Sequence, residues 1–344
     1  MPRNINDTEL GLLRAASDNT GYTLMIAAGL DTAHQRIASA DTYIDAQSPF
    51  DRHARIGIPQ GAATVDQTLF LAYLGTQILA WSDDETQKLT KITANLRLIF
   101  DSMSLHLPER IYLVKSTGRE EAAAAYTRHL DTIVLPANMV ASLYATPPGG
   151  DPLHPGQSTE YLAGVVTHEL FHLLSKNNPA WRAQLYGYVG YRILENSVTL
   201  PDTKGPNGFS LCDLKITNPD APLLNVAVDL IPPGETDPCP MVPVLASSQP
   251  YATGEFFDTL NWFFLAVERE AGEWKARRHD AMPAFNPSDP TDPMLTQYLA
   301  KIGRNFTGEL FHPDEVLAQN FVIAAAEPSL DLLKQIRLAI WPNT

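Results

Sequence analysis

The stretch from 158 to 178 constrains this chain more than any other part of its sequence. Apolar residues recur in it at the three- and four-residue spacing of a helix with one buried face. Ser158 is a suitable N-terminal cap, and Pro179 follows the last helical position. The sequence therefore predicts one amphipathic helix, and residues 168–172 of this helix read His-Glu-Leu-Phe-His.

The spacing of His168, Glu169 and His172 has a chemical consequence. Residues four apart on a helix point the same way, so the two imidazoles can bind one zinc ion. Glu169 lies beside the first of them, where it can reach a zinc-bound water, take its proton and later deliver it to a leaving group. The alternative is a buried helix with two hydrogen-bonded histidines.

This His-Glu-x-x-His run is the signature of the zincin metallopeptidases, and the helix resembles their active-site helix. The resemblance implies an α+β fold with a zincin-like core, made of a small mixed or antiparallel sheet and this helix. Alternating or β-branched residues at 110–115 and 132–135 predict strands just before it. By the same resemblance, 125–136 would contain the edge strand that pairs with an extended peptide.

A catalytic zinc ion needs a third protein ligand. The metzincin extension of the motif is missing, because Ser175 and Asn178 stand at the positions of its glycine and third histidine. The remaining zincin pattern is that of the gluzincins, in which a glutamate from a later helix completes the metal site.

Two glutamates compete for this role. Glu315 lies in the first turn of a predicted helix, in a segment that resembles the His-Pro-x-Glu-x-x-Ala-x-Asn-Phe segments of some other proteins with the motif. Glu195 lies near the distance at which thermolysin-like enzymes place their ligand, but its surroundings predict a strand and a turn. We prefer Glu315 and keep Glu195, His312 and Asp314 as alternatives. A glutamate in a first turn could also simply stabilise the helix dipole.

The rest of the chain suggests two regions. Residues 1–105 are expected to be a helical N-terminal region, and 106–344 a zincin-like catalytic region. Turn-rich sequence predicts a β- and loop-rich insertion at 195–254, and periodic apolar residues predict C-terminal helices within 294–341. Further helices are predicted at 7–17, 31–46, 64–81, 83–104 and 180–194, and loops at 146–157 and 279–293.

Charge and hydropathy exclude several partners. The net charge is −14 and no basic run is present, which argues against nucleic acid and anionic membrane surfaces. No run of eighteen apolar residues or secretory signal is seen, so we expect a cytoplasmic protein, although a removed leader would look the same. Cys212 and Cys239 form no metal motif and could be paired or free.

The resemblance implies a zinc-dependent metallohydrolase, most simply a metallopeptidase acting on a peptide or small amide. Two alternatives remain: a zinc hydrolase of a non-peptide amide or ester, and a non-catalytic zinc-stabilised binding protein. The group that stabilises the oxyanion and the oligomeric state are left open. The candidates for that group are Tyr186, Tyr188, Tyr191, Tyr251, His279 and His312.

Overall fold

The computed structural model describes residues 6–14, 22–100, 106–141, 160–205, 207–277, 292–302 and 310–326. It is a mixed α/β structure, as the α+β prediction requires, and the chain divides into two compact units. The first unit comprises Met1–Asp41, Thr68–Arg182 and Ala318–Thr344, and the second Thr42–Gln67 and Ala183–Leu317. These units do not follow the predicted boundary at residue 105.

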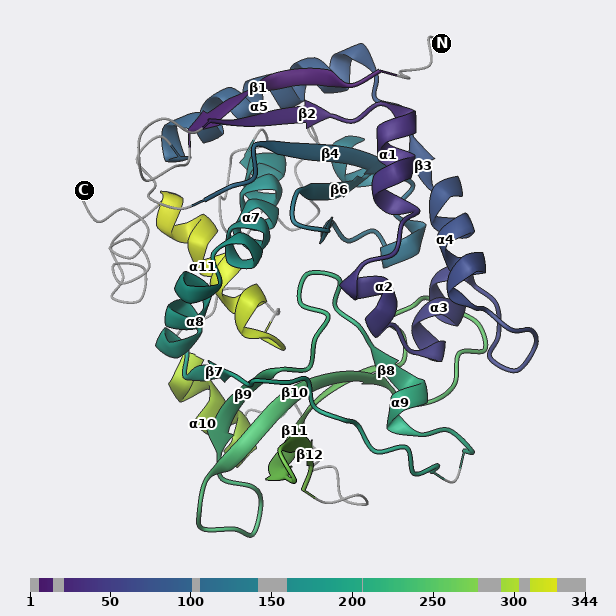
Figure 1. The fold of residues 1–344 in the computed structure, drawn as a ribbon, viewed down its shortest axis with the longest axis vertical. Coiled ribbons are helices and arrows are strands. Elements are labelled where there is room, and N and C mark those ends of the chain that lie inside the picture. Colours follow the sequence, from purple (N-terminus) through teal and green to yellow (C-terminus); the bar gives the residue numbers. More distant parts are fainter. Residues whose placement is uncertain are drawn as a thin grey trace. The chain divides into compact units, whose positions relative to one another are not determined.

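The first unit contains a mixed sheet in the order β1-β2-β4-β6-β5, with β3 also pairing with β4 (Figure 1). The β2-β4 and β4-β6 pairs are parallel, and the outer pairs β1-β2 and β5-β6 are antiparallel. The strands are β1 (Thr8–Arg14), β2 (Tyr22–Ala27), β3 (Ile78–Leu79), β4 (Arg110–Ser116), β5 (Tyr126–Arg128) and β6 (Thr132–Pro136).

The sequence predicted the centre of this sheet but not its N-terminal edge. The strands expected at 110–115 and 132–135 are confirmed as β4 and β6, and β5 is an edge strand, as expected of 125–136. The helix expected at 7–17 is wrong, because β1 pairs antiparallel with β2 there, so 1–105 is not purely helical. The TELGLLR segment is too short and ambiguous to reveal this pairing partner locally.

Helices cover the first-unit sheet. The long helix α5 (Asp83–Phe100) packs on β1, and α7 (Glu160–Asn177) lies against β5 and β6 (Figure 1). A capping box starts α5, because Ser82 and Glu85 each accept a hydrogen bond from the other's backbone N–H. The shorter helices are α1 (Leu30–Ile37), α4 (Gln67–Thr76), α6 (Ala137–Ala141) and the 3₁₀ turn η1 (Arg119–Glu121).

The second unit is built on an antiparallel sheet in the order β12-β11-β10-β9-β7, with β8 pairing with β10. Three of its strands fall in the stretch 195–254, for which the sequence predicts strands and loops. The strands are β7 (Tyr191–Ile193), β8 (Lys215–Ile216), β9 (Val226–Leu230), β10 (Cys239–Ser247), β11 (Leu260–Glu270) and β12 (Glu273–Ala276). Its helices are α2 (Thr42–Ala46), α3 (Pro49–Ile56), α9 (Leu211–Leu214) and α10 (Pro293–Ile302).

Two further helices, α8 and α11, each contain residues of both units. The helix α8 (Pro179–Tyr188) is shorter than the predicted 180–194, because the chain turns at Gly190, which has a φ of 78°, and enters β7. The helix α11 (Pro313–Ala326) begins with second-unit residues and ends with first-unit residues as one continuous helix.

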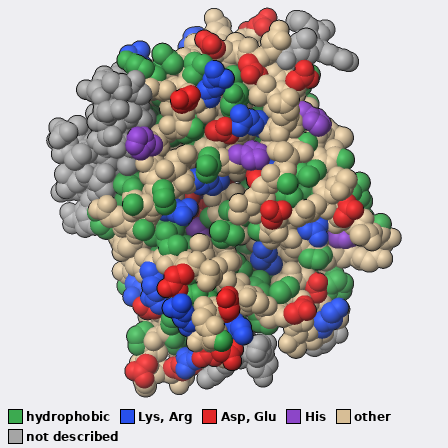
Figure 2. All heavy atoms as spheres, viewed as in Figure 1, with side chains coloured by type: hydrophobic (Ala, Val, Ile, Leu, Met, Phe, Trp, Pro, Cys, Tyr) green, Lys and Arg blue, Asp and Glu red, His purple; other side chains and the backbone are tan. Residues whose placement is uncertain are grey.

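Some predicted features lie outside the described residues. These are the cap Ser158, the loop at 146–157, most of the loop at 279–293 and the last predicted helix. Among the helices that the structure describes, none is long and apolar enough to cross a membrane. On the face drawn in Figure 2, Lys and Arg side chains lie among Asp and Glu side chains. Both cysteines are free thiols.

Candidate metal centre

The helix α7 carries the motif and is held firmly in the first unit. Its apolar side chains are almost fully buried: Leu162, Val166, Leu170, Phe171, Leu173 and Leu174. In the last turn, Lys176 Nζ donates to Thr127 Oγ1 on β5 at 2.5 Å. Asn177 Nδ2 donates to the carbonyl of Leu130 at 2.8 Å. These bonds fix α7 along the edge hairpin β5-β6.

The two motif histidines lie side by side on α7. The ring centroids of His168 and His172 are 4.8 Å apart and their planes are at 73°. His172 is buried, His168 is half-buried, and the Glu169 side chain between them is only 4% exposed. Two imidazoles and a carboxylate so buried within an apolar helix would be costly unless charges or hydrogen bonds compensate them.

Aromatic packing joins the second half of α11 to α7 within the first unit. The ring centroids of Phe171 and Phe321 are 5.5 Å apart, and Phe321 also contacts Phe100 at 6.2 Å. Trp181 packs on the other side of Phe171 at 5.6 Å. Residue 171 is part of the motif run, so α11 is anchored beside the motif by its own core residues.

The preferred third ligand, Glu315, lies on the first turn of α11 and belongs to the second unit. Glu315 is only 5% exposed. Asn218 Nδ2 donates to Glu315 Oε1 at 2.7 Å, while Asn218 Oδ1 accepts from the backbone N–H of Asp220 at 2.9 Å. The amide of Asn218 therefore holds the carboxylate of Glu315 in one orientation, as outer hydrogen bonds do for metal ligands.

Neighbouring side chains fix the start of α11. The N–H of Asp314 donates to His312 Nδ1 at 3.1 Å, so this nitrogen keeps its lone pair. Tyr186 Oη donates to Asp314 Oδ1 at 2.8 Å, and the Tyr186 and His312 rings meet edge to face. His312 and Asp314, the alternative ligands, are thus both engaged in holding this turn.

The competing glutamate has a different environment. Glu195 follows β7, and its side chain is 64% exposed. Its carboxylate forms an ion pair with Arg269 at 3.5 Å. This exposure and this partner are typical of a surface residue, so the structure favours Glu315 over Glu195.

The other candidate oxyanion donors differ in their partners. Tyr191 Oη donates to Tyr298 Oη at 3.1 Å, and burial raises the pKa of the Tyr191 hydroxyl well above its ordinary value. Tyr188 accepts from Gln184, and Tyr251 donates to the carbonyl of Gly254. These bonds indicate structural roles for all three hydroxyls, whereas His279 lies outside the described residues.

The positions of several buried or site residues could not be predicted from the sequence. His53 is buried at 7% exposure on α3, a helix that begins at a Ser48 cap and is not among the predicted helices. Asn218 and Asp220 lie in the turn-rich stretch 195–254, and their spacing in the sequence does not indicate a site. Two sets of described side chains have the types and number that could hold a metal ion. They are His168, His172 and Glu315, and Glu169, His172 and Asp220.

Comparison with known proteins adds no further constraint. No family model matches this chain, and no curated protein or solved structure matches it either.

Proposed function

We propose that this chain is a zinc-dependent metallohydrolase, most simply a metallopeptidase. The observation that carries the proposal is the pair of adjacent imidazoles on one face of α7, with the buried carboxylate of Glu169 between them in sequence. This is the arrangement of a zincin active-site helix, and it provides two ligands and a general base at once.

Glu315 is proposed as the third ligand. Its helix is continuous, and Phe321, less than two turns further on, packs against Phe171 beside the motif histidines. A buried glutamate on that helix, oriented by the amide of Asn218, completes a two-histidine, one-glutamate donor set of the kind catalytic zinc sites use. Cysteine ligands, typical of structural zinc sites, are absent from this set.

The proposed site residues have separate roles in metal binding and proton transfer. When bound, a catalytic zinc ion activates water and polarises the scissile carbonyl. His168, His172 and Glu315 would hold the ion. Glu169 would take a proton from the attacking water and return it to the leaving amine. The carboxylate is fixed on a well-packed helix, so little reorganisation accompanies the proton transfer.

Peptides are the favoured substrate because of the sheet edge. The edge strand β5 lies against α7, and Thr127 on this strand is tied to Lys176 of the same helix. An extended peptide adds to a sheet edge through main-chain hydrogen bonds. The three residues of β5 are at most 1% exposed, so this edge would have to open before a peptide could bind. A peptide bound there would run alongside the motif helix.

The decisive experiment compares the wild type with Glu169→Gln. Both proteins are purified without chelator, their zinc content is measured, and hydrolysis of a mixed peptide library is followed by mass spectrometry. We expect both to hold about one zinc ion and only the wild type to hydrolyse peptides, with a rate at least about 100-fold higher.

The other outcomes are equally informative. Equal activity in the two proteins would remove Glu169 from the mechanism. Zinc in both without hydrolysis of peptides, amides or esters would favour the zinc-stabilised binding protein. A wild type that cannot take up any transition metal would refute the metal centre itself.

A further inference from the structure

A pocket in the second unit lies next to the proposed ligand Glu315. It is partly open to solvent, and its enclosed part has room for about one water molecule, so an occupant would place one small end group inside and extend towards the opening. Its wall includes Asn218, whose amide is hydrogen-bonded to Glu315. It also includes His312, which lies three residues before Glu315 in the chain. The pocket is thus separated from the Glu315 carboxylate by a single side chain.

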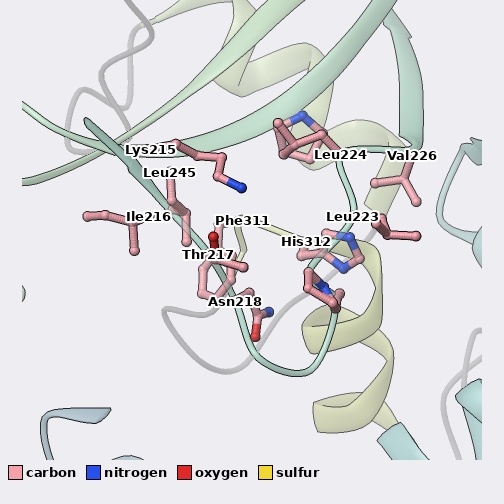
Figure 3. A pocket seen from close by; sticks show the side chains of 13 residues that line it. Lys215, Ile216, Thr217, Asn218, Leu223, Leu224, Val226, Leu245, Phe311 and His312 are labelled. Atoms are coloured by element: carbon pink, nitrogen blue, oxygen red, sulfur yellow. The ribbon is translucent and has the colours of Figure 1, made fainter. Parts of the chain in front are cut away.

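The lining of this pocket is mostly apolar, and its polar side chains are those of Lys215, Thr217, Asn218 and His312. Hydrophobic side chains from the chain around β8, β9 and β10 form most of the wall: Ile216, Leu223, Leu224, Val226, Leu245 and Phe311. Figure 3 shows the Lys215 side chain reaching into the space, with Thr217 near its amine. An occupant would therefore need an apolar body and a group that binds a lysine amine.

The charges around Lys215 leave a positive excess. Its amine donates to the carbonyl of Ala46, which uses one of three N–H donors. The nearest carboxylate, Asp51, is already bound by Arg55, whose Nη1 lies 2.6 Å from Asp51 Oδ1. Two cations thus share one anion. Burial lowers the pKa of the Lys215 amine, although the Asp51 charge acts in the opposite direction.

We propose that this pocket binds a carboxylate-bearing side chain of the substrate, such as that of glutamate, with its carboxylate on Lys215 and its methylenes against the apolar wall. This inference rests on the proposed function, since it names the substrate class of the same site. The added anion would balance the second cation, and a charge-assisted bond in a largely buried place discriminates strongly between substrates.

The test uses Lys215→Met, which keeps the length and apolar stem of the side chain but removes its charge. Hydrolysis of peptides that differ only by Glu or Gln at one position is compared in the two proteins. We expect the wild type to prefer Glu by about 10- to 100-fold in kcat/KM and the variant to lose this preference while still cleaving the Gln peptide.

Two further variants test whether the loss of the Glu preference is specific to this pocket. Leu223 lines the pocket but is 42% exposed, so Leu223→Trp can obstruct the entrance without disturbing the core, and it should weaken the Glu peptide's binding. Lys275→Met removes a lysine that is 41% exposed in the same unit, and it should leave the Glu preference unchanged.

A binding measurement separates the pocket from the proposed function. Calorimetric titration with hexanoate and with hexanol requires no turnover. If no peptide is hydrolysed, the metallopeptidase proposal fails, but hexanoate binding to the wild type and not to Lys215→Met would still support a carboxylate pocket. A wild type that hydrolyses Glu and Gln peptides equally, or that binds hexanoate no better than hexanol, would overturn the pocket assignment and leave the metallopeptidase proposal standing.

Discussion

At the scale of single residues, the glutamates differ most in their surroundings. Glu315 is buried and hydrogen-bonded to Asn218, whereas Glu195 is exposed and paired with Arg269. We expect Glu315→Ala to weaken zinc binding by at least about 100-fold, because it removes one of three ligands. Glu195→Ala should leave it unchanged. Competition with a fluorescent chelator measures both affinities, and the reverse result would assign the third ligand to Glu195.

Glu120 provides a residue-scale prediction for the pH dependence of stability. Its side chain is buried in η1, where Tyr126 Oη donates to it at 3.4 Å, and burial raises its pKa above the ordinary value of 4.5. The folded state therefore binds this proton more tightly than the unfolded state. This contribution is present at pH below 4.5 and is lost as the pH rises through the folded-state pKa.

Glu120→Gln removes that dependence, because the amide stays neutral. The variant should match the wild type at pH 4 and be more stable at pH 7. Urea denaturation at the two pH values measures the difference. A variant that is less stable than the wild type only at pH 7 would show that Glu120 is stabilised as the anion.

At the scale of elements, a buried ion pair within α3 is hydrogen-bonded to Thr217, the residue that follows β8 in the second unit. Asp51 on α3 accepts from Arg55 and from the N–H and hydroxyl of Thr217, and both charged side chains are at most 1% exposed. Removing one partner of such a pair leaves an uncompensated charge in the interior. These contacts tie α3 to the segment that carries Lys215 and Asn218.

Asp51→Ala should therefore destabilise the protein by about 3–5 kcal/mol. Asp229→Ala is the matched control, because Asp229 forms an exposed ion pair with Arg192, and it should cost less than about 1 kcal/mol. Chemical denaturation followed by tryptophan fluorescence compares the two. Similar small losses for both variants would mean that Arg55 finds full compensation elsewhere.

At the scale of the whole molecule, a bound metal ion should stabilise the fold. A ligand that binds only the native state adds about 2.7 kcal/mol when its free concentration is 100 times its Kd. We expect chelation to lower the melting temperature of the wild type by several degrees and to have no effect on His172→Ala. Scanning calorimetry measures the shift, and equal responses of the two proteins would place the metal elsewhere.

The elements that could be predicted from sequence are those whose apolar residues recur at the regular spacing of a helix or a strand. The helix α7, the helices α10 and α11 and the strands β4 and β6 follow from apolar spacing and from nearby start and stop signals. The strand β1 could not be predicted, because its identity depends on pairing with β2. The helix α3 is not among the predicted helices because it is short, with only eight residues from Pro49 to Ile56.

The sequence alone determined the motif helix and which of its side chains share a face, because residues four apart on a helix point the same way wherever that helix packs. The preference for Glu315 also came from the sequence, through its place in a first turn and the resemblance of its segment to those of other proteins with the motif. Only the tertiary structure decided that Asn218, 97 positions away in the chain, orients this glutamate and that Lys215 lines a pocket beside it. No repeating pattern of apolar residues links the segments that make these contacts. The contacts therefore form only when strands and loops distant in sequence pack together.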